Sequence, residues 1–349
     1  MDTAAFDYDL PEERIAQHPL AERAAARLLV DEGASRPPSD RVVRDLPDLL
    51  DPGDVLVVNT TRVLPARLHL RKDTGGAAEV LLLERIDGQE WEALVRPSRK
   101  LPAGTRLRPP GGEDDLRVVM GDDLGEGRRR ITLAVDGDEL EVLERHGEMP
   151  LPPYITERLD DPGRYQTVFA DRPASAAAPT AGLHLTPALL ERIEARGVAV
   201  HHVELVVGLG TFRPITAERV EDHVMHSEQY RVPSTTWAAC AATRAEGGRV
   251  VAVGTTAVRA LESAAATGEP EGRTELFITP GFEFRVVDRM LTNFHLPRSS
   301  LLVMIEAFVG PRWRDLYAAA LAGGYRFLSF GDAMLLTRSD VDLGRRASG

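Results

Sequence analysis

The stretch of residues 203–228 constrains the fold most, because it joins an apolar run to a dense group of titratable side chains. The run at 203–207 has the composition of a buried strand, and it ends at the turn Gly208-Leu209-Gly210-Thr211. A strand that delivers a glycine turn and then titratable groups is typical of a site at the carboxyl edge of an α/β sheet. The pattern also fits a strand, a tight turn and an amphipathic helix with a solvated acidic face. The titratable positions are Glu221, Asp222, His223, His226 and Glu228.

The bulk composition indicates a globular protein with a sizeable core. The chain has 349 residues, of which 43% are hydrophobic and 28% charged, and a length of this order favours two domains. Its first residues are acidic and it contains no apolar run of membrane-spanning length, so neither a signal peptide nor a membrane partner is expected. Cys240 is the only cysteine, which excludes a disulfide framework or a cysteine-ligated metal cluster within one chain. We therefore expect a cytoplasmic protein.

The net charge of −12 argues against a protein that coats nucleic acid through a general positive field. The basic residues are nevertheless concentrated in the first 130 positions, which predicts a local phosphate-binding face. Arginine usage in a GC-rich genome would explain the residue type but not the clustering. The concentrated residues are Arg62, Arg67, Arg71, Lys72, Arg96, Arg99, Lys100, Arg106, Arg108, Arg128, Arg129 and Arg130.

Short apolar runs separated by hairpin turns occupy the region from about residue 67 to 135. The runs at 79–85, 90–95, 116–120 and 129–135 predict strands of a small antiparallel β-barrel. Residues 139–146 predict a short closing helix, and Pro150, Pro152 and Pro153 mark a boundary.

Helices and strands alternate after this boundary, which predicts a three-layer α/β/α domain. Helices are expected at 187–197, 235–246, 258–266, 299–309 and 313–322, with strands at 198–207, 249–253 and 275–279. The apolar run at 54–58 has the same buried character. We therefore predict that residues 1–65 and 151–349 form one discontinuous α/β catalytic domain, into which a barrel of residues 66–150 is inserted. A patch at 12–16 is expected to be helical and the tail at 340–349 to be frayed.

Polar groups follow several of the predicted strands or precede helices, where they can point into a crevice. A glycine turn before a helix offers free N–H groups to an anion, and His184 lies beside such a turn. The alternatives are ordinary: Asn59 and Thr61 can cap the next element, Arg259 can pair with Glu262, and loop residues can stabilise one another. The candidate binding groups are Asn59, Thr61, Arg62, Thr180, Gly182, Gly254, Thr255, Thr256, Arg259, Asn293 and His295.

Motifs of other enzyme classes are missing from the sequence. Gly254-Thr255-Thr256 lacks the lysine and spacing of a P-loop, and Arg213 replaces the third glycine of a dinucleotide fingerprint. There is no G-x-S-x-G elbow and no HExxH, so hydrolase and dehydrogenase functions lose support. The spacing of His223 and His226 could suit a metal, but this signal is weak and we predict no metal site.

Taken together, the motifs resemble the S-adenosylmethionine:tRNA ribosyltransferase-isomerase family of queuosine biosynthesis over nearly the whole chain. That resemblance implies an α/β domain with an inserted β-barrel, in agreement with the pattern above. The matching motifs are Phe6-Asp7-Tyr8-Asp9-Leu10-Pro11, Asn59 with Thr61-Arg62-Val63, Pro65-Ala66-Arg67-Leu68, Met149-Pro150-Leu151-Pro152-Pro153-Tyr154-Ile155, residues 179–184, Gly208-x-Gly210-Thr211-Phe212, residues 221–228, Gly254-Thr255-Thr256-x-Val258-Arg259, residues 292–297 and Tyr325-Arg326-Phe327.

The resemblance also implies the reaction. The ribosyl part of S-adenosylmethionine is transferred to 7-aminomethyl-7-deazaguanine at the wobble position of a tRNA anticodon stem-loop and isomerised, giving epoxyqueuosine with loss of adenine and methionine. S-adenosylmethionine is then a donor substrate, and no prosthetic group is expected. A monomer is expected as well.

The chemistry of the implied reaction suggests roles for the titratable groups. The sulfonium acidifies the 5′ carbon, so His226 or His184 is expected to act as base, with Glu228 orienting it. Asp222 or Glu221 would face the sulfonium or the ribose, and His295 would protonate the departing adenine. The remaining positions expected to bind substrate are Asn59, Thr61, Arg62, Thr180, Gly182, Gly208, Gly210, Thr211, His223, Gly254, Thr255, Thr256, Arg259 and Asn293.

The sequence departs from the common family pattern at Thr60, Leu185, Val206, Ala257 and Thr279. Val206 matters most, because a histidine normally precedes the Val-Gly pair at that position. Three alternatives therefore stay open: a paralogue that uses S-adenosylmethionine on another acceptor, a non-catalytic binder of S-adenosylmethionine or tRNA, and, more remotely, a metal-dependent hydrolase that uses His223 and His226.

Overall fold

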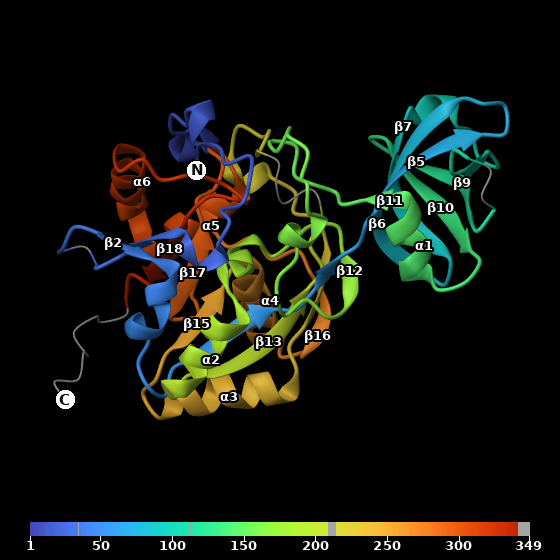
Figure 1. The fold of residues 1–349 in the computed structure, drawn as a ribbon. Helices are drawn as coiled ribbons and strands as arrows, with labels where there is room; N and C mark the ends of the chain where they lie inside the picture. Colours follow the sequence, from blue (N-terminus) through green and yellow to red (C-terminus); the bar gives the residue numbers. More distant parts are fainter. Residues whose placement is uncertain (34, 112–113, 209–213, 341–349) are drawn as a thin grey trace.

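The computed structural model describes residues 1–33, 35–111, 114–208 and 214–340. Figure 1 shows a large α/β body beside a smaller β-barrel, which the chain enters at β5 (Arg67–Lys72) and leaves after β11 (Gly147–Glu148). The predicted α/β/α domain with an inserted antiparallel barrel is confirmed. The exact domain boundaries stay a prediction, and the tail from 341 onward lies outside the described residues.

A mixed nine-stranded sheet forms the centre of the α/β body. Its middle strands β13, β3, β15 and β17 are parallel, and Val55 of β3 is paired with Ala199 on one side and Val250 on the other. The strands in spatial order are β16 (Glu271–Thr274), β14 (Glu228–Arg231), β13 (Ala199–Leu205), β3 (Val55–Asn59), β15 (Val250–Val253), β17 (Arg289–Asn293), β18 (Ala333–Thr337), β1 (Arg27–Val30) and β2 (Ser39–Val42).

Helical layers cover both faces of this sheet, which explains why β3 and β15 are apolar throughout. Successive side chains of a strand point to opposite faces. Val55 and Val57 therefore join the core formed with α4 (Thr255–Thr267), α5 (Ser300–Val309) and α6 (Trp313–Ala322). Leu56 and Val58 join a second core with α2 (Pro187–Ala195) and the 3-10 segment Val43–Leu49. The helix α3 (Ser234–Ala245) contributes Cys240 to the first core.

The barrel is closed by pairing between its first and last strands. Six antiparallel strands run in the order β5, β6, β7, β10, β9, β8, and β8 pairs back onto β5. Their inward side chains form a separate core, to which Val142 and Leu143 of the predicted helix α1 (Glu139–His146) contribute. The strands other than β5 are β6 (Ala77–Asp87), β7 (Glu90–Arg96), β8 (Arg106–Arg108), β9 (Leu116–Gly125) and β10 (Arg128–Val135).

The structure corrects several local predictions. The strand predicted at 275–279 is wrong: the strand is Glu271–Thr274, an edge strand whose polar sequence has no apolar alternation. Ile278 is buried in the main core without strand pairing, which accounts for the apolar composition that suggested a strand there. The acidic positions after 220 form no amphipathic helix but a 3-10 turn at Val220–Asp222, and the patch at 12–16 is likewise a 3-10 turn, Glu12–Arg14.

None of the helices within the described residues combines the length and the apolar composition that a membrane crossing requires.

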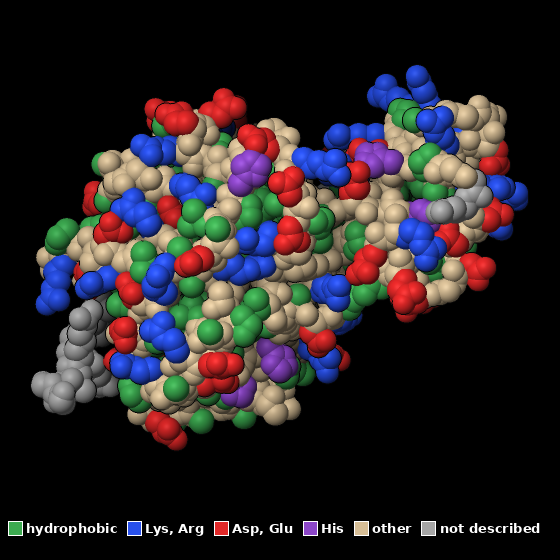
Figure 2. Space-filling view, in the orientation of Figure 1, with side chains coloured by type: hydrophobic (Ala, Val, Ile, Leu, Met, Phe, Trp, Pro, Cys, Tyr) green, Lys and Arg blue, Asp and Glu red, His purple; other side chains and the backbone are tan. Residues whose placement is uncertain are grey.

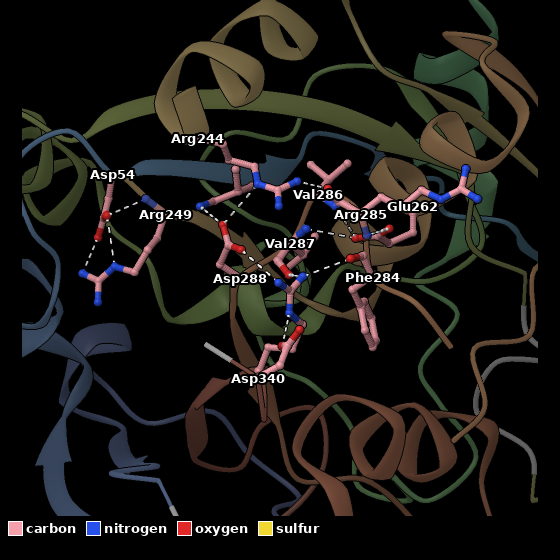
Figure 3. Close-up of polar contacts among 12 residues, drawn as sticks. Asp54, Arg244, Arg249, Glu262, Phe284, Arg285, Val286, Val287, Asp288 and Asp340 are labelled. Atoms are coloured by element: carbon pink, nitrogen blue, oxygen red, sulfur yellow. Dashed lines mark hydrogen bonds and ion pairs between the residues drawn. The ribbon is translucent and has the colours of Figure 1, made fainter. Parts of the chain in front are cut away.

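Buried ionic contacts connect the amino-terminal ends of the central strands (Figure 3). Asp54, whose side chain is 1% exposed, accepts hydrogen bonds from the backbone N of Arg249 at 2.9 Å and from its Nη2 at 2.7 Å. Asp288 accepts a hydrogen bond from the backbone N of Val250 at 2.9 Å. Because these residues precede β3, β15 and β17, the contacts hold three neighbouring strands in register.

We expect the Asp54→Ala substitution to lower the free energy of unfolding by about 3–5 kcal/mol, because it leaves a half-buried guanidinium and backbone N–H groups without their acceptor. Asp51→Ala is the matched control. Asp51 pairs with the same Arg249 at 2.6 Å, but its side chain is 52% exposed, so its loss should cost less than about 1 kcal/mol. Urea unfolding of both variants measures the difference. Equal losses would contradict the assignment of Asp54 as the main tether.

Candidate active site

A pocket lies at the carboxyl ends of the parallel strands β13, β15 and β17. It contains about 590 Å³ of space, part of it open to solvent. Segments that are distant in sequence contribute to its walls, namely the turn before α4, the 3-10 segment Thr180–His184, and the residues after β17. The candidate residues that line it are Thr180, Gly254, Thr255, Thr256, Asn293 and His295.

The amino-terminal end of α4 forms one wall of this pocket. Gly254 has a φ of 89°, a left-handed conformation that glycine adopts without strain, and it lets the chain turn from β15 directly into the helix. The first N–H groups of a helix have no partner within the helix and attract acceptor groups. Thr256 Oγ1 is buried beside them and has no hydrogen-bond partner in the described structure. This wall can therefore bind the polar groups of a substrate.

Asn293, the last residue of β17, also lines the pocket and holds a second part of its wall in place. Thr180 Oγ1 donates a hydrogen bond to Asn293 Oδ1 at 3.0 Å, and Asn293 Nδ2 lies 3.1 Å from His184 Nε2. Asn293 Nδ2 also donates to the backbone oxygen of Leu328 at 3.2 Å. Asn293 thus holds the segment Thr180–His184 against β17, so that it positions the pocket wall as well as lining it.

Both histidines near this wall are buried and neutral at pH 7. Burial, together with Arg326 and Arg23, lowers the pKa of His184 to about 4. Burial lowers the pKa of His295 to about 3, and its Nε2 lies 3.0 Å from Thr292 Oγ1. His184 does not line the pocket, and its Nε2 already accepts from Asn293. A neutral His295 can exchange hydrogen bonds with a bound base, but an imidazolium at this position is disfavoured.

Glu228 and Arg259 form an ion pair that is buried on both sides, with side-chain exposures of 5% and 4%. Glu228 Oε1 also accepts the N–H of Gly208 at 3.1 Å. The alternative that Arg259 pairs with Glu262 is wrong, since Glu262 instead accepts the backbone N–H groups of residues 285–287 at 2.8–3.0 Å. The Glu228–Arg259 pair therefore connects α4, β14 and the turn that follows β13.

The other titratable residues of the 221–228 group, like Glu228, are not among the residues that line the pocket. Glu221 pairs with the chain's amino group and with Arg219, while Asp222 and His226 are exposed. His223 packs edge-on against the ring of Phe277 at 5.5 Å, and partial burial lowers its pKa. Gly210 and Thr211 lie outside the described residues.

Four other candidates have structural contacts. Asn59 Oδ1 accepts the N–H of Leu205 at 3.2 Å, and Thr61 Oγ1 donates to the oxygen of Leu205 at 3.3 Å, so both clamp the end of β13 onto β3. Gly182 is buried where a Cβ would lie 2.7 Å from Phe169. Arg62 pairs with Glu144 of the barrel helix α1 at 3.1 Å. None of these four residues lines the pocket.

The structure adds a contact that the sequence did not indicate, between the barrel and β14. Arg273 of β16 pairs with Glu84 of β6, and Gln229 Nε2 donates to Glu84 Oε1 at 3.1 Å. Arg273 also donates to Ser227 Oγ at 3.0 Å, one residue before Glu228. The sequence shows that Arg273 and Glu84 carry opposite charges, but it does not indicate that they pair, because they are 189 positions apart.

Within the described ranges, no cluster of three or more His, Cys, Asp or Glu side chains has a geometry suited to a metal ion.

Comparisons with known proteins give one consistent family. The model of the family described as "Queuosine biosynthesis protein" matches residues 3–336. The chain is 51% identical to the S-adenosylmethionine:tRNA ribosyltransferase-isomerase of Symbiobacterium thermophilum, over 95% of this chain and 98% of that protein. It is 50% identical to the protein of the same name from Pelotomaculum thermopropionicum, over 96% of this chain and 100% of the relative. It is also similar to the crystal structure of S-adenosylmethionine tRNA ribosyltransferase from Thermotoga maritima, with a TM-score of 0.54, 36% identity, and coverage of 95% and 99%.

The pKa of His184 predicts a pH dependence of stability. Because the folded-state pKa is lowered from 6.5 to about 4, the unfolded state binds more protons between these values, and stability falls as the pH drops through this window. His184→Gln keeps a hydrogen-bond acceptor for Asn293. In this variant, the free energy of unfolding should fall by about 3 kcal/mol less over the same pH range than in the unmodified protein. Urea unfolding from pH 7.5 to 4.5 measures it, with the exposed His226→Gln as control. Identical pH profiles of the two variants would refute the buried neutral state.

Proposed function

We propose, from the premise that the chain belongs to the queuosine biosynthesis family of S-adenosylmethionine:tRNA ribosyltransferase-isomerases, that it forms epoxyqueuosine in tRNA. In this proposal it transfers and isomerises the ribosyl part of S-adenosylmethionine onto 7-aminomethyl-7-deazaguanine at the wobble position, with release of adenine and methionine. The observation that carries the proposal is the carboxyl-edge pocket, into which the family motifs at 179–184, 254–259 and 292–297 converge.

The pocket suits the nucleoside part of the donor. Its wall combines the open N–H groups of α4 and the unpartnered Thr256 Oγ1 with apolar contact from Phe294, Leu296 and Leu328. Binding sites for small molecules typically pair an apolar lining with a few fixed polar groups. His295, neutral through burial, would hydrogen-bond to the adenine base. The role expected of His295 from the sequence, as the acid that protonates departing adenine, loses support, because its pKa of about 3 leaves almost no imidazolium at pH 7.

His226 is the preferred base in this proposal. A base must remove a proton from the 5′ carbon next to the sulfonium, and an imidazole that is accessible and not engaged by a neighbour suits this step. His184 is the weaker alternative, because its Nε2 accepts from Asn293 and its pKa is about 4. His226 is exposed, and it lies two residues from Glu228, which accepts the N–H of Gly208, the residue that follows the pocket-lining Val207.

The direct test is incubation with S-adenosylmethionine and a tRNA that carries 7-aminomethyl-7-deazaguanine, followed by mass analysis of the nucleosides. The expected products are epoxyqueuosine in the tRNA and equimolar adenine and methionine. Release of adenine without a mass gain in the tRNA would favour a paralogue with another acceptor. Binding of both substrates with no turnover at all would favour the non-catalytic binder.

We predict that His226→Ala lowers kcat by about 10²–10⁴-fold while the Kd for S-adenosylmethionine changes little, because a positioned base contributes in this range. His202→Ala is the matched control, since His202 is another exposed histidine and belongs to β13. Single-turnover rates at saturating substrate measure the effect. Full turnover by His226→Ala would exclude this residue as the base.

The tRNA phosphates would be bound by those barrel arginines that have no carboxylate partner. Figure 2 shows Lys and Arg side chains gathered along the upper margin of the barrel and at its junction with the α/β body. Arg128, Arg129 and Arg130 are all within ion-pair distance of carboxylates, at 3.2, 3.7 and 3.5 Å. By contrast, Arg71 and Arg96 line a groove on the barrel surface, and neither forms an ion pair among the described residues. Their charge is available to an RNA backbone.

We expect Arg71→Gln and Arg96→Gln each to reduce the slope of log K against log salt for tRNA binding by about 1, because each removes one phosphate contact. Arg130→Gln serves as the control: its side chain is 45% exposed but pairs with Glu90, so the slope should stay close to that of the unmodified protein. Filter binding or fluorescence anisotropy at several salt concentrations measures the slopes. A larger change for Arg130→Gln than for Arg71→Gln would contradict the assignment.

A further inference from the structure

A second, smaller cavity adjoins the candidate active pocket and is lined by three arginines. It contains about 290 Å³ of space, part of it open to solvent, and shares Ser329 with the pocket described above. Arg23, Arg164 and Arg326 line it together with His184. Arg23 belongs to the 3-10 turn Arg23–Ala25, Arg164 to the 3-10 turn Pro162–Tyr165, and Arg326 to the loop after α6, so the tertiary fold alone brings them together.

All three guanidinium groups donate to backbone oxygens and not to carboxylates. Arg23 donates to Leu183 and Gly163 at 3.0 Å each. Arg164 Nη2 donates to Leu20 at 2.5 Å, and Arg326 Nη2 donates to Phe330 at 2.7 Å. None of the three forms an ion pair with a described residue, although Asp332 accepts the backbone N–H of Arg326 at 2.8 Å.

Carbonyl partners satisfy N–H donors but do not neutralise the positive charges, and the carboxylates that act on them, Asp161 on Arg23 and Asp332 on Arg326, form no ion pair with either side chain. Elsewhere in the molecule Arg249, Arg259 and Arg312 are paired with carboxylates, whereas the buried Arg289 donates to the backbone oxygen of Leu49. Around the second cavity the charges act on one another. Burial and then Arg164 lower the pKa of Arg23, which Asp161 offsets in part, and Arg326 and Arg23 add to the burial that lowers the pKa of His184. Like charges that converge on a low-dielectric cavity repel, and a bound anion would relieve this repulsion.

We propose that the three-arginine cavity is an anion subsite that holds an oxyanion of one of the enzyme's substrates. Each guanidinium retains N–H groups beyond those used for the carbonyl contacts, and arginine binds carboxylates and phosphates through paired hydrogen bonds. This proposal rests on the proposed function for the identity of the substrates. The oxyanion is either the carboxylate of the methionine part of S-adenosylmethionine or a phosphodiester of the tRNA, and the two sources predict different results.

The first measurement uses the unmodified protein and inorganic phosphate, and it needs no turnover. Phosphate should raise the thermal midpoint more than chloride at equal ionic strength, because it binds the folded state. It should also compete with whichever substrate occupies the cavity. Absence of both effects would overturn the proposal, whether or not the protein forms epoxyqueuosine.

Substitutions identify the source of the oxyanion. Arg23→Gln should abolish the effect of phosphate on the thermal midpoint and raise the Kd of one substrate by about 10–100-fold. Arg23→Lys should restore part of this affinity. If the source is the carboxylate, the Kd of S-adenosylmethionine rises while that of its decarboxylated analogue does not change. If the source is a phosphodiester, the Kd of tRNA rises, and the slope of log K against log salt for tRNA binding falls by about 1.

Arg192→Gln is the matched control, because Arg192 also donates to a backbone oxygen, that of Arg44 at 3.0 Å, but lies outside the cavity. Arg192→Gln should leave the effect of phosphate on the thermal midpoint and the Kd values of both substrates unchanged. A folded Arg23→Gln protein that binds both substrates normally would overturn the proposal and leave Arg23 with a purely structural role. The binding constants separate this outcome from failure of the proposed function, which would show as an absence of turnover in the unmodified protein.

Discussion

The geometry of the candidate site depends on one buried ion pair, between Glu228 and Arg259. Removing two charges from water is costly unless each is compensated, so such a pair strongly restricts how the segments that carry it can pack. Arg259 lies one turn inside α4, whose first residues form a wall of the pocket, and Glu228 begins β14. Glu228 also accepts the N–H of Gly208, so the end of β13 belongs to the same unit. A shift of any of these elements would leave a buried charge without its partner.

This unit also extends to the barrel. Glu84 of the barrel contacts Arg273 and Gln229, and Arg273 contacts Ser227 next to Glu228. The barrel carries the arginines that we assign to tRNA phosphates, whereas the pocket at the sheet edge is assigned to the donor. The Glu84 contacts therefore fix the position of the barrel relative to β14, whose first residue Glu228 forms the buried ion pair. Arg62 and Glu144 form a second contact across the same junction.

Much of the architecture could be predicted because its signals are local. The all-apolar runs that became β3 and β15, the Thr186-Pro187 start of α2 and the helix α6 each carry their own pattern of residues. The polar edge strand β16 was misplaced, since its pairing with β14 and not its composition makes it a strand. Six candidate site residues do line one pocket, because they follow parallel strands or precede helices, and such positions meet at one edge of a sheet.

The sequence by itself determined the family, the α/β and barrel classes and the set of polar residues near strand ends, since these depend on motifs and periodicity along the chain. Only the tertiary structure decided what each polar side chain contacts. It placed Glu228 in a buried ion pair and left His226 in solvent, although the two are neighbours in sequence, and it used Asn59 and Thr61 to clamp β13. It also brought Arg23, Arg164 and Arg326 to one cavity. Burial, and with it the charge of His184 and His295, arises from packing between distant segments, which no local pattern records.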